Sequence, residues 1–205
     1  MAQQINVEHE NKQRFRMMGK KENIRILVAG ALLFFISIYM DKYVNLLFAD
    51  VKIPFFDFIL SIITNFSIVM LVILIIPAII LYNKNKKSAY LLFASFFASF
   101  ILAFALKLVF LRQRPFGTFA FPLTNIIDYS FPSMHAMAVF ALLPILLLYL
   151  PKQKYFWIIF AASAVFSRLY FRLHYLSDVV FGIFAGYFIG IIMINLYEKG
   201  KLWKK

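Results

Sequence analysis

The amino-acid sequence predicts an all-α fold: a polytopic membrane protein with six transmembrane helices and both termini in the cytoplasm. Of its 205 residues, 63% are hydrophobic, and the mean hydropathy is +0.81, whereas apolar residues make up about half of an average soluble domain. The hydrophobic residues form six continuous runs rather than alternating with polar ones. Continuous runs favour helices over the strands of a membrane barrel, because a helix satisfies its own backbone hydrogen bonds in lipid.

Each run approaches the roughly 20 residues that a helix needs to cross about 30 Å of hydrocarbon. The first run lacks the small residues of a cleavage site near Tyr39-Met40-Asp41, so it is predicted to remain as a span. We therefore expect one membrane domain, residues 23–205, after a basic cytoplasmic tail, residues 1–22. The predicted spans are Asn23 to Met40, Ile59 to Tyr82, Ser88 to Leu111, Ser133 to Leu150, Tyr155 to Phe171 and Val179 to Tyr197.

The connection between the first two spans, Asp41 to Phe58, is apolar and aromatic with scattered charges. This composition suits a helix lying in the membrane interface, and it equally suits a plain connector anchored by phenylalanines. In the last span, Gly182, Gly186 and Gly190 recur at every fourth residue. Such a stripe of small residues predicts close packing against another helix of the same chain.

The distribution of Lys and Arg predicts the orientation of the helices. Positive charges in short loops resist translocation, so segments rich in Lys and Arg stay in the cytoplasm. With six spans, one face of the membrane receives most of the 22 Lys and Arg residues, including those of both termini. The net charge of +13 thus reflects clusters that anchor helices at an anionic membrane surface, and no nucleic-acid partner is expected.

Five cations contradict this orientation rule, because they gather around the outer ends of the third and fifth spans: Lys107, Arg112, Arg114, Arg168 and Arg172. Their position is costly unless they bind an anion there. We therefore predict a site that faces outward from the cell membrane. For Arg112 and Arg172, anchoring in the interface is favoured over contact with a diphosphate or a larger headgroup.

Two histidines in this outer cluster predict nucleophilic chemistry on phosphate. His174 and Asp178 are four residues apart, so on a helix they share one face. An aspartate that holds one ring nitrogen fixes the tautomer and leaves the other nitrogen free to attack. His174 is therefore the predicted nucleophile, with Asp178 as its partner.

The remaining members of the cluster complete a phosphoryl-transfer site. Lys107, Arg114 and Arg168 supply positive charge for the non-bridging oxygens of a phosphoryl group. His135 follows Ser133 at the start of a predicted helix, where free backbone amides favour an anion. We predict that His135 protonates the departing oxygen and then activates water to hydrolyse the phosphohistidine. This mechanism requires no metal and no cofactor, and the absence of cysteine excludes thiolate metal sites and cysteine nucleophiles.

Each of these residues also has a structural explanation when it is considered alone. A single histidine near the membrane interface is usually structural, and a basic residue at a helix end is usually an anchor. However, two of the three histidines in the chain fall in the outer cluster beside Arg and Asp, and only His9 lies in the tail. Their combination favours a catalytic site.

The cluster is made of three motifs, in this order: Lys107 with Arg114-Pro115, then Pro132-Ser133-Met134-His135, then Ser167-Arg168 with His174 and Asp178. They resemble the motifs Lys-x6-Arg-Pro, Pro-Ser-Gly-His and Ser-Arg-x5-His-x3-Asp of the type 2 phosphatidic acid phosphatase superfamily. The resemblance covers the third to the sixth predicted span. It implies six helices and an outward site, in agreement with the charges.

The resemblance also implies a role for each motif residue. It implies phosphate binding by Lys107, Arg114 and Arg168, a further hydrogen bond from Ser133, His135 as the acid, and His174 with Asp178 as the nucleophile pair. One position departs from the family pattern, because Met134 stands where the family has glycine. The backbone donor of Met134 remains, so the added side chain must point away from the phosphate or reshape the pocket.

The function implied is an integral membrane lipid phosphatase without metal or cofactor, acting on a membrane phospholipid or polyprenyl phosphate. A polyprenyl diphosphate is the favoured substrate, followed by phosphatidylglycerol phosphate or phosphatidate. One alternative is a lipid phosphotransferase, in which an alcohol takes the phosphoryl or phosphoalcohol group. Another is an inactive lipid-binding or transport protein, although a transporter would place its charges near midspan. Resemblance to the soluble vanadium-dependent haloperoxidases is limited to the anion pocket, so vanadate is expected to inhibit rather than to serve as a cofactor.

Overall fold

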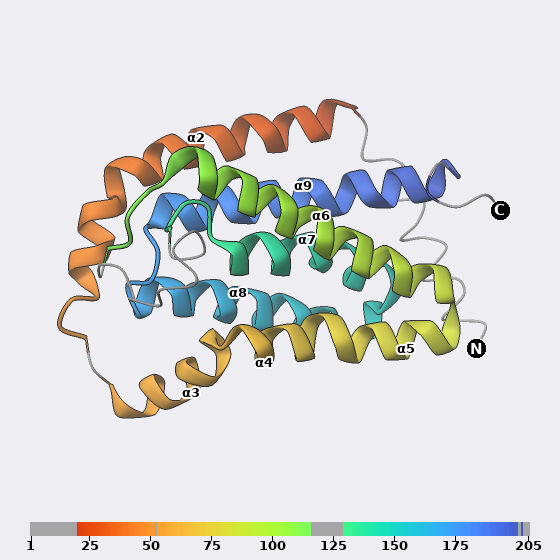
Figure 1. Cartoon of the computed structure of the whole chain (residues 1–205), viewed down its shortest axis with the longest axis horizontal. Coiled ribbons are helices and arrows are strands. Elements are labelled where there is room, and N and C mark those ends of the chain that lie inside the picture. Colours follow the sequence, from red (N-terminus) through yellow and green to blue (C-terminus); the bar gives the residue numbers. More distant parts are fainter. Residues whose placement is uncertain (1–19, 52, 116–128, 201, 203–205) are drawn as a thin grey trace.

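The computed structural model describes residues 20–51, 53–115, 129–200 and 202, and every regular element in this part is helical (Figure 1). The predicted all-α class is therefore confirmed. The predicted tail, residues 1–22, lies outside the described residues as far as residue 19. The elements are α2 (Lys20–Leu47), α3 (Pro54–Thr64), α4 (Phe66–Met70), the π-helical turn η1 (Leu71–Ile75), α5 (Ile76–Lys84), α6 (Lys86–Phe110), α7 (Met134–Tyr149), the 3₁₀ turn η2 (Pro151–Gln153), α8 (Lys154–Tyr170) and α9 (Leu176–Glu198).

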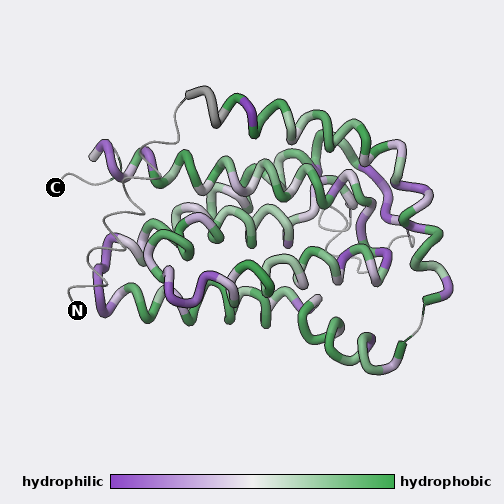
Figure 2. The backbone as a smooth tube through the Cα atoms, turned by 180° about the vertical axis from the view of Figure 1, so that it is seen from behind, coloured by the Kyte–Doolittle hydropathy of each residue, from purple (hydrophilic) through white to green (hydrophobic). Residues whose placement is uncertain are grey.

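The described helices form a multi-pass membrane bundle, with hydrophilic residues concentrated towards its two ends (Figure 2). Four segments are long and apolar enough to cross a bilayer. The pair α7 and α8 would make a fifth, but turn η2 joins the two helices with a bend of 119°. The count is thus four or five by length and composition, against the six predicted, because α7 and α8 have only 16 and 17 residues. The four long segments are Ile24–Leu47, Phe66–Lys84, Lys86–Phe110 and Leu176–Glu198.

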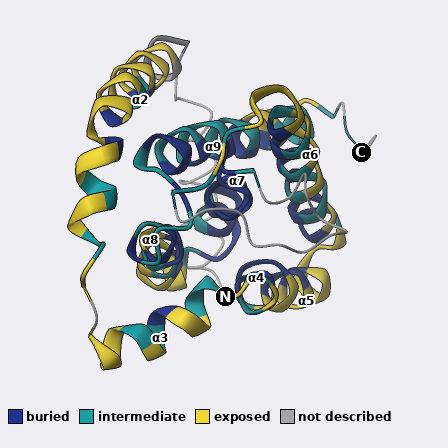
Figure 3. Ribbon diagram, turned by 60° about the vertical axis from the view of Figure 1, so that its left-hand side comes forward, coloured by how far each residue is buried: buried dark blue, intermediate teal, exposed yellow. Residues whose placement is uncertain are grey.

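Helix α7 lies at the centre of the bundle (Figure 3). Nearly all of its side chains are buried, which agrees with a sequence that is apolar on every side. Its most extensive packing is against α9, and α6 and α8 also contact it. Helix α2 packs on the far side of α9. The N-terminal end of α7 therefore meets the ends of several other helices, and this is where the predicted site residues occur.

The second predicted span, Ile59 to Tyr82, begins later in the structure. Helix α3 ends at Thr64, the backbone of Asn65 is extended (φ −70°, ψ 118°), and a new helix begins at Phe66. The Asn65 side chain caps the new helix by accepting hydrogen bonds from the amides of Ser67 and Ile68. Hydropathy alone could not reveal this break, because the residues on both sides are apolar.

Helix α3 answers the question left open for the connection between the first two spans. It is helical from Pro54 onward and packs against α8, while Phe55 and Phe58 remain exposed. The Tyr170 hydroxyl of α8 donates a hydrogen bond to Asp57 of α3. The predicted connection is therefore divided: Asp41 to Leu47 continue α2, and Pro54 to Phe58 begin α3. Helix α3 is docked on α8 and has an exposed aromatic face, which suits the expected interfacial helix.

The glycine stripe of α9 packs against α7, as predicted. A Cβ atom built at Gly186 would lie 2.4 Å from the carbonyl oxygen of Met137, and one built at Gly190 would lie 2.5 Å from that of Ala141. Both obstacles are backbone atoms of α7, which cannot move without shifting the helix. The stripe thus sets how closely the two helices approach each other.

We expect Gly186→Ala to lower the free energy of unfolding by roughly 1–3 kcal/mol, the usual range for overpacking. Gly30→Ala serves as the matched control, because the three atoms nearest to a Cβ there all belong to the side-chain ring of Phe184, the closest at 2.7 Å, and a ring can reorient. Thermal unfolding of both variants in the same detergent measures the difference. Equal losses in the two variants would contradict the packing described for α7 and α9.

Candidate active site

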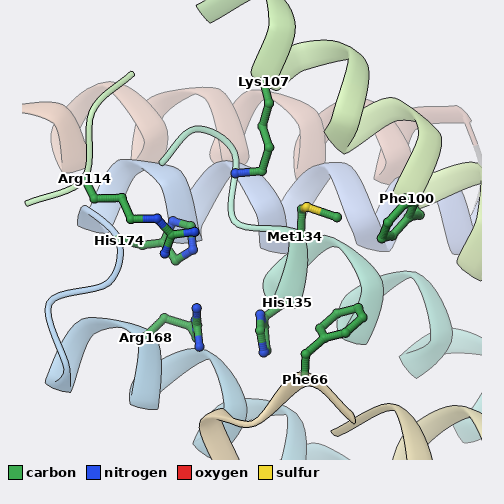
Figure 4. A pocket seen from close by; sticks show the side chains of 8 residues that line it. All are labelled: Phe66, Phe100, Lys107, Arg114, Met134, His135, Arg168 and His174. Carbon is green, nitrogen blue, oxygen red and sulfur yellow. The ribbon is translucent and has the colours of Figure 1, made fainter. Parts of the chain in front are cut away.

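A pocket of about 260 Å³ opens where the ends of α4, α6, α7 and α8 converge (Figure 4). Two of the eight predicted site residues, Ser133 and Asp178, do not line it. The other six do: Lys107, Arg114, Met134, His135, Arg168 and His174. Phe66 and Phe100 complete the lining. Phe66 and His174, which are 108 positions apart in the sequence, are therefore brought together at one end of the bundle.

The turn between α8 and α9 places His174 in this pocket. The backbone amides of Leu173 and His174 both donate to the carbonyl oxygen of Arg168, at 2.9 and 3.3 Å. Arg172 adopts a left-handed backbone conformation (φ 54°), and its Nε donates to Asn45 of α2 at 2.6 Å. The turn is thus held by hydrogen bonds to both α8 and α2. His174 therefore lies beside the C-terminal end of α8, which carries Arg168.

His174 and Asp178 are adjacent, and Ser130 lies between them. The Nδ1 atom of His174 is 3.6 Å from Oδ2 of Asp178, which is longer than a hydrogen bond, and 3.4 Å from the Ser130 hydroxyl. That hydroxyl donates to Oδ2 of Asp178, which also accepts from the Tyr175 amide at 2.9 Å. The carboxylate and the hydroxyl both face Nδ1, so Nε2 is the ring nitrogen left for the pocket.

Three cations converge on the pocket, and no carboxylate lines it within the described part of the chain. Lys107 is 1% exposed, and its ammonium donates to the carbonyl oxygen of Tyr129. Arg114 donates to the carbonyl of Leu173 at 3.1 Å. The Nε of Arg168 is buried and has no hydrogen-bond partner among the described residues. A buried N–H of a guanidinium without an acceptor is costly, and an anion in the pocket would satisfy it.

His135 lies on the opposite wall of the pocket from Lys107 (Figure 4). Its Nε2 is 3.0 Å from the carbonyl oxygen of Thr64, and its ring packs edge-on against Phe66, with the centroids 4.9 Å apart. Because a carbonyl can only accept, Nε2 carries the proton in this contact. The ring is therefore fixed in orientation beside Arg168 and His174.

Ser133 and Met134 lie at the start of α7, where only Met134 lines the pocket. The Ser133 hydroxyl caps α7 by accepting from the Ala136 amide at 3.4 Å, so in this structure it serves the helix end. Met134 lines the pocket with Phe100 and packs near Ala103. Its side chain therefore reshapes the pocket wall and makes that wall apolar, which glycine would not do.

Sequence reasoning missed the role of Arg112, which was expected to anchor in the interface. One guanidinium nitrogen contacts Asp178 at 2.7 Å and the other contacts Asp41 of α2 at 2.6 Å. Asp41 also accepts from the amide and the hydroxyl of Ser177. Arg112 thus joins two buried carboxylates behind His174. The sequence held a signal, because Asp41 is a charge within an apolar helix and needs a partner.

A sequence model of the PAP2 superfamily matches residues 88–201, which is more than half of the chain and contains all three motifs. The chain belongs to the PAP2 superfamily. It is 31% identical over 134 residues to an undecaprenyl-diphosphatase of Sulfolobus acidocaldarius. That match covers 62% of this chain, and the chain spans 63% of the length of that relative.

The fold of this PAP2 protein is also found among solved structures. A transmembrane PAP2-type phosphatidylglycerolphosphate phosphatase from Bacillus subtilis superposes with a TM-score of 0.64, over 84% of this chain and 96% of that one. The two sequences are 23% identical, so this likeness concerns the fold alone. The predicted family is therefore confirmed, while the roles of the individual residues are predictions.

The predicted nucleophile of this PAP2 protein is held in its neutral form. Burial lowers the pKa of the His174 imidazole well below its ordinary value of 6.5, and the charges of Arg168, Arg114 and Lys107 lower it further. Only a neutral imidazole has a lone pair with which to attack phosphorus. The same cations that would bind the phosphate thus favour the neutral form of His174, which is the form that can attack.

This lowered pKa predicts how stability changes with pH. As the pH falls below 6.5, the unfolded chain binds a proton that folded His174 does not, so the free energy of unfolding decreases by up to about 1.4 kcal/mol per pH unit. We expect His174→Gln to remove this contribution and to flatten the curve between pH 7 and pH 5. Denaturant unfolding in detergent without phosphate measures it. Identical slopes for the two proteins would contradict the lowered pKa.

Proposed function

We propose that this PAP2 protein is a lipid phosphatase that hydrolyses a lipid phosphate or diphosphate through a phosphohistidine on His174. One observation carries the proposal: a single pocket holds three cations and two histidines, with no carboxylate in its lining among the described residues. Such a pocket stabilises the charge of a phosphoryl group in the transition state. The relative from Sulfolobus acidocaldarius is named for diphosphate hydrolysis, which supports this reaction class.

The proposed reaction has two steps. First, Nε2 of His174 forms a bond to phosphorus, the bond from phosphorus to the leaving oxygen breaks, and His135 gives that oxygen a proton. Second, His135 takes a proton from water, whose oxygen attacks phosphorus and releases inorganic phosphate and neutral His174. Asp178 stabilises the positive charge that His174 gains in the first step. Lys107, Arg114 and Arg168 neutralise the non-bridging oxygens throughout.

The pocket is suited to the headgroup of a lipid rather than to the whole molecule. Its volume of about 260 Å³ lies below the roughly 300–1,000 Å³ of pockets that enclose a drug-sized ligand. Phe66 of α4, Phe100 of α6 and Met134 form its apolar side. Helix α6 packs closely against α5 but contacts α4 far less. A lipid tail would therefore leave the pocket between α4 and α6 and remain in the bilayer.

The proposal includes the topology that the charges predict. Segments α2, α4 to α5, α6, α7, α8 and α9 run alternately towards and away from the pocket end of the bundle (Figure 1). If α7 and α8 each cross the membrane, the chain has six spans. The first residue of α2 and the last residue of α9 then lie on the face opposite the pocket. The positive-inside rule then puts both termini in the cytoplasm and the site on the outer side of the cell membrane.

The preferred substrate in this proposal is a polyprenyl diphosphate, ahead of phosphatidylglycerol phosphate and phosphatidate. The test is release of inorganic phosphate from each of these lipids by the purified protein in detergent with EDTA. An added acceptor alcohol distinguishes a phosphotransferase, which would form a phosphorylated alcohol in place of free phosphate. Phosphate release in EDTA supports the proposal, and the rates rank the substrates. No release by a folded protein would favour an inactive lipid-binding protein.

A further inference from the structure

We propose that Thr64, at the end of helix α3, is a positioning residue for both His135 and Arg168. No motif contains it, and it lies 71 residues before His135. This inference rests on the proposed function, because it assigns to Thr64 the task of holding the acid and one phosphate-binding arginine. Thr64 does not line the pocket and acts through the two residues that do.

Thr64 offers two acceptors to these side chains. Its carbonyl oxygen accepts from Nε2 of His135 at 3.0 Å and from a terminal guanidinium nitrogen of Arg168 at 3.1 Å. Its hydroxyl accepts from the same Arg168 nitrogen at 2.6 Å. Among the described residues, these are the side-chain hydrogen bonds that the structure gives to Arg168, whose Nε has no partner. By holding this terminal nitrogen, Thr64 therefore fixes the direction in which the unpaired Nε of Arg168 points.

The carbonyl is free for this task because of the break at Asn65. In an unbroken helix the Thr64 carbonyl would accept from the amide of Ile68, four residues later. Here the Asn65 side chain accepts from that amide instead, at 3.3 Å, and also from the Ser67 amide at 3.0 Å. The cap thus replaces the Thr64 carbonyl in the helix and releases it to the active site.

The same arrangement connects the site to a surface helix. Thr64 ends α3, whose exposed face carries Phe55 and Phe58. Helix α3 is held to α8 by the hydrogen bond from Tyr170 to Asp57, and α8 carries Arg168. The position of α3 therefore determines where the two Thr64 acceptors lie. A helix docked in the membrane interface would in this way help to orient the catalytic acid.

The hydroxyl contact is tested with Thr64→Val, which keeps the shape and the backbone carbonyl but removes the acceptor. We expect kcat/KM for a short polyprenyl diphosphate to fall about tenfold, and the inhibition constant for orthovanadate to rise similarly. Thr64→Ser should restore both values to within about threefold, because it keeps the hydroxyl. Ser61→Ala is the matched control on the same helix, since within the described part of the chain the Ser61 hydroxyl bonds the carbonyl of Phe58 and no site residue.

The carbonyl contact is tested with Asn65→Ala, which should let the Ile68 amide compete for the Thr64 carbonyl. We expect kcat to fall about tenfold, and Asn65→Asp, which keeps a capping oxygen, to recover it. Asn85→Ala is the control. Asn85 caps α6 in the same way, because its side chain accepts a hydrogen bond from the Lys87 amide at 3.0 Å, and it lies outside the site. Loss of this cap should therefore lower thermal stability and leave kcat unchanged.

The outcomes separate this inference from the proposed function. If the wild-type protein releases phosphate but Thr64→Val matches Ser61→Ala, or if Thr64→Ser is as poor as Thr64→Val, the positioning role is overturned and the phosphatase stands. If the wild-type protein releases no phosphate, the proposed function fails. In that case the role of Thr64 is tested by orthovanadate binding, which is measured as the rise in melting temperature that orthovanadate causes. Weaker binding to Thr64→Val than to the wild-type protein supports the positioning role, and equal binding overturns it.

Discussion

Replacing His174 by alanine is expected to lower the rate of lipid phosphate release by at least about 10⁴-fold, the scale of loss when a catalytic nucleophile is removed. The reason is chemical, because the described part of the pocket lining holds no serine, cysteine or carboxylate that could accept the phosphoryl group in its place. The remaining cations would still bind the phosphate. We therefore expect kcat to collapse while binding of orthovanadate persists.

The matched control for this prediction is His9→Ala. The chain has three histidines, and His9 is the one outside the motifs, so its replacement should leave the rate of phosphate release unchanged. Both variants are measured with the same lipid in EDTA, together with their melting temperatures. Retention of more than about a hundredth of the wild-type rate by folded His174→Ala would contradict the assignment of the nucleophile.

Replacing Asp178 by asparagine is expected to lower kcat by about 10³- to 10⁴-fold, because an amide can present a donor to His174 and stabilise the wrong tautomer. The variant should also be less stable, since Arg112 loses one of its two buried carboxylates. Part of that loss is offset because the Arg112 side chain is 31% exposed and keeps its contact with Asp41. Steady-state kinetics and unfolding of the same preparation measure both effects.

Asp41→Asn separates these two effects. Asp41 shares Arg112 with Asp178, at 2.6 Å, and is also buried, with its side chain 8% exposed, but it has no contact with His174 in the structure. Its replacement should therefore lower stability to a similar extent, with a much smaller loss of kcat. Equal losses of kcat in the two variants would mean that Asp178 acts only by holding the helices together.

The helices and the cluster of site residues could be predicted because each has a local signal. A span is marked by a run of apolar residues, and Lys107, Arg114 and His174 are marked as polar residues at the ends of such runs. The glycine stripe of α9 predicted its packing for a similar reason, since every fourth residue lies on one helical face. Signals of this kind require no knowledge of which helices are neighbours.

The remaining features depend on contacts between distant segments. Asp41 and Arg112 are separated by 71 residues, so their pairing could not be inferred from spacing. The break at Asn65 lies between two apolar stretches and is decided by side-chain hydrogen bonds rather than by hydropathy. The predicted number of spans also differs from the count by length, because α7 and α8 are short helices joined by a sharp turn that hydropathy does not show.

The central claim is that the phosphoryl group is carried by His174, and trapping of the intermediate tests it most directly. The purified protein would be mixed with a polyprenyl diphosphate labelled in the terminal phosphate, quenched rapidly in alkali, and analysed by peptide mapping. We predict a label on the peptide that contains His174, stable in alkali, labile in acid, and absent from His174→Ala. A label on another residue, or phosphate release by folded His174→Ala above about a hundredth of the wild-type rate, would contradict the account.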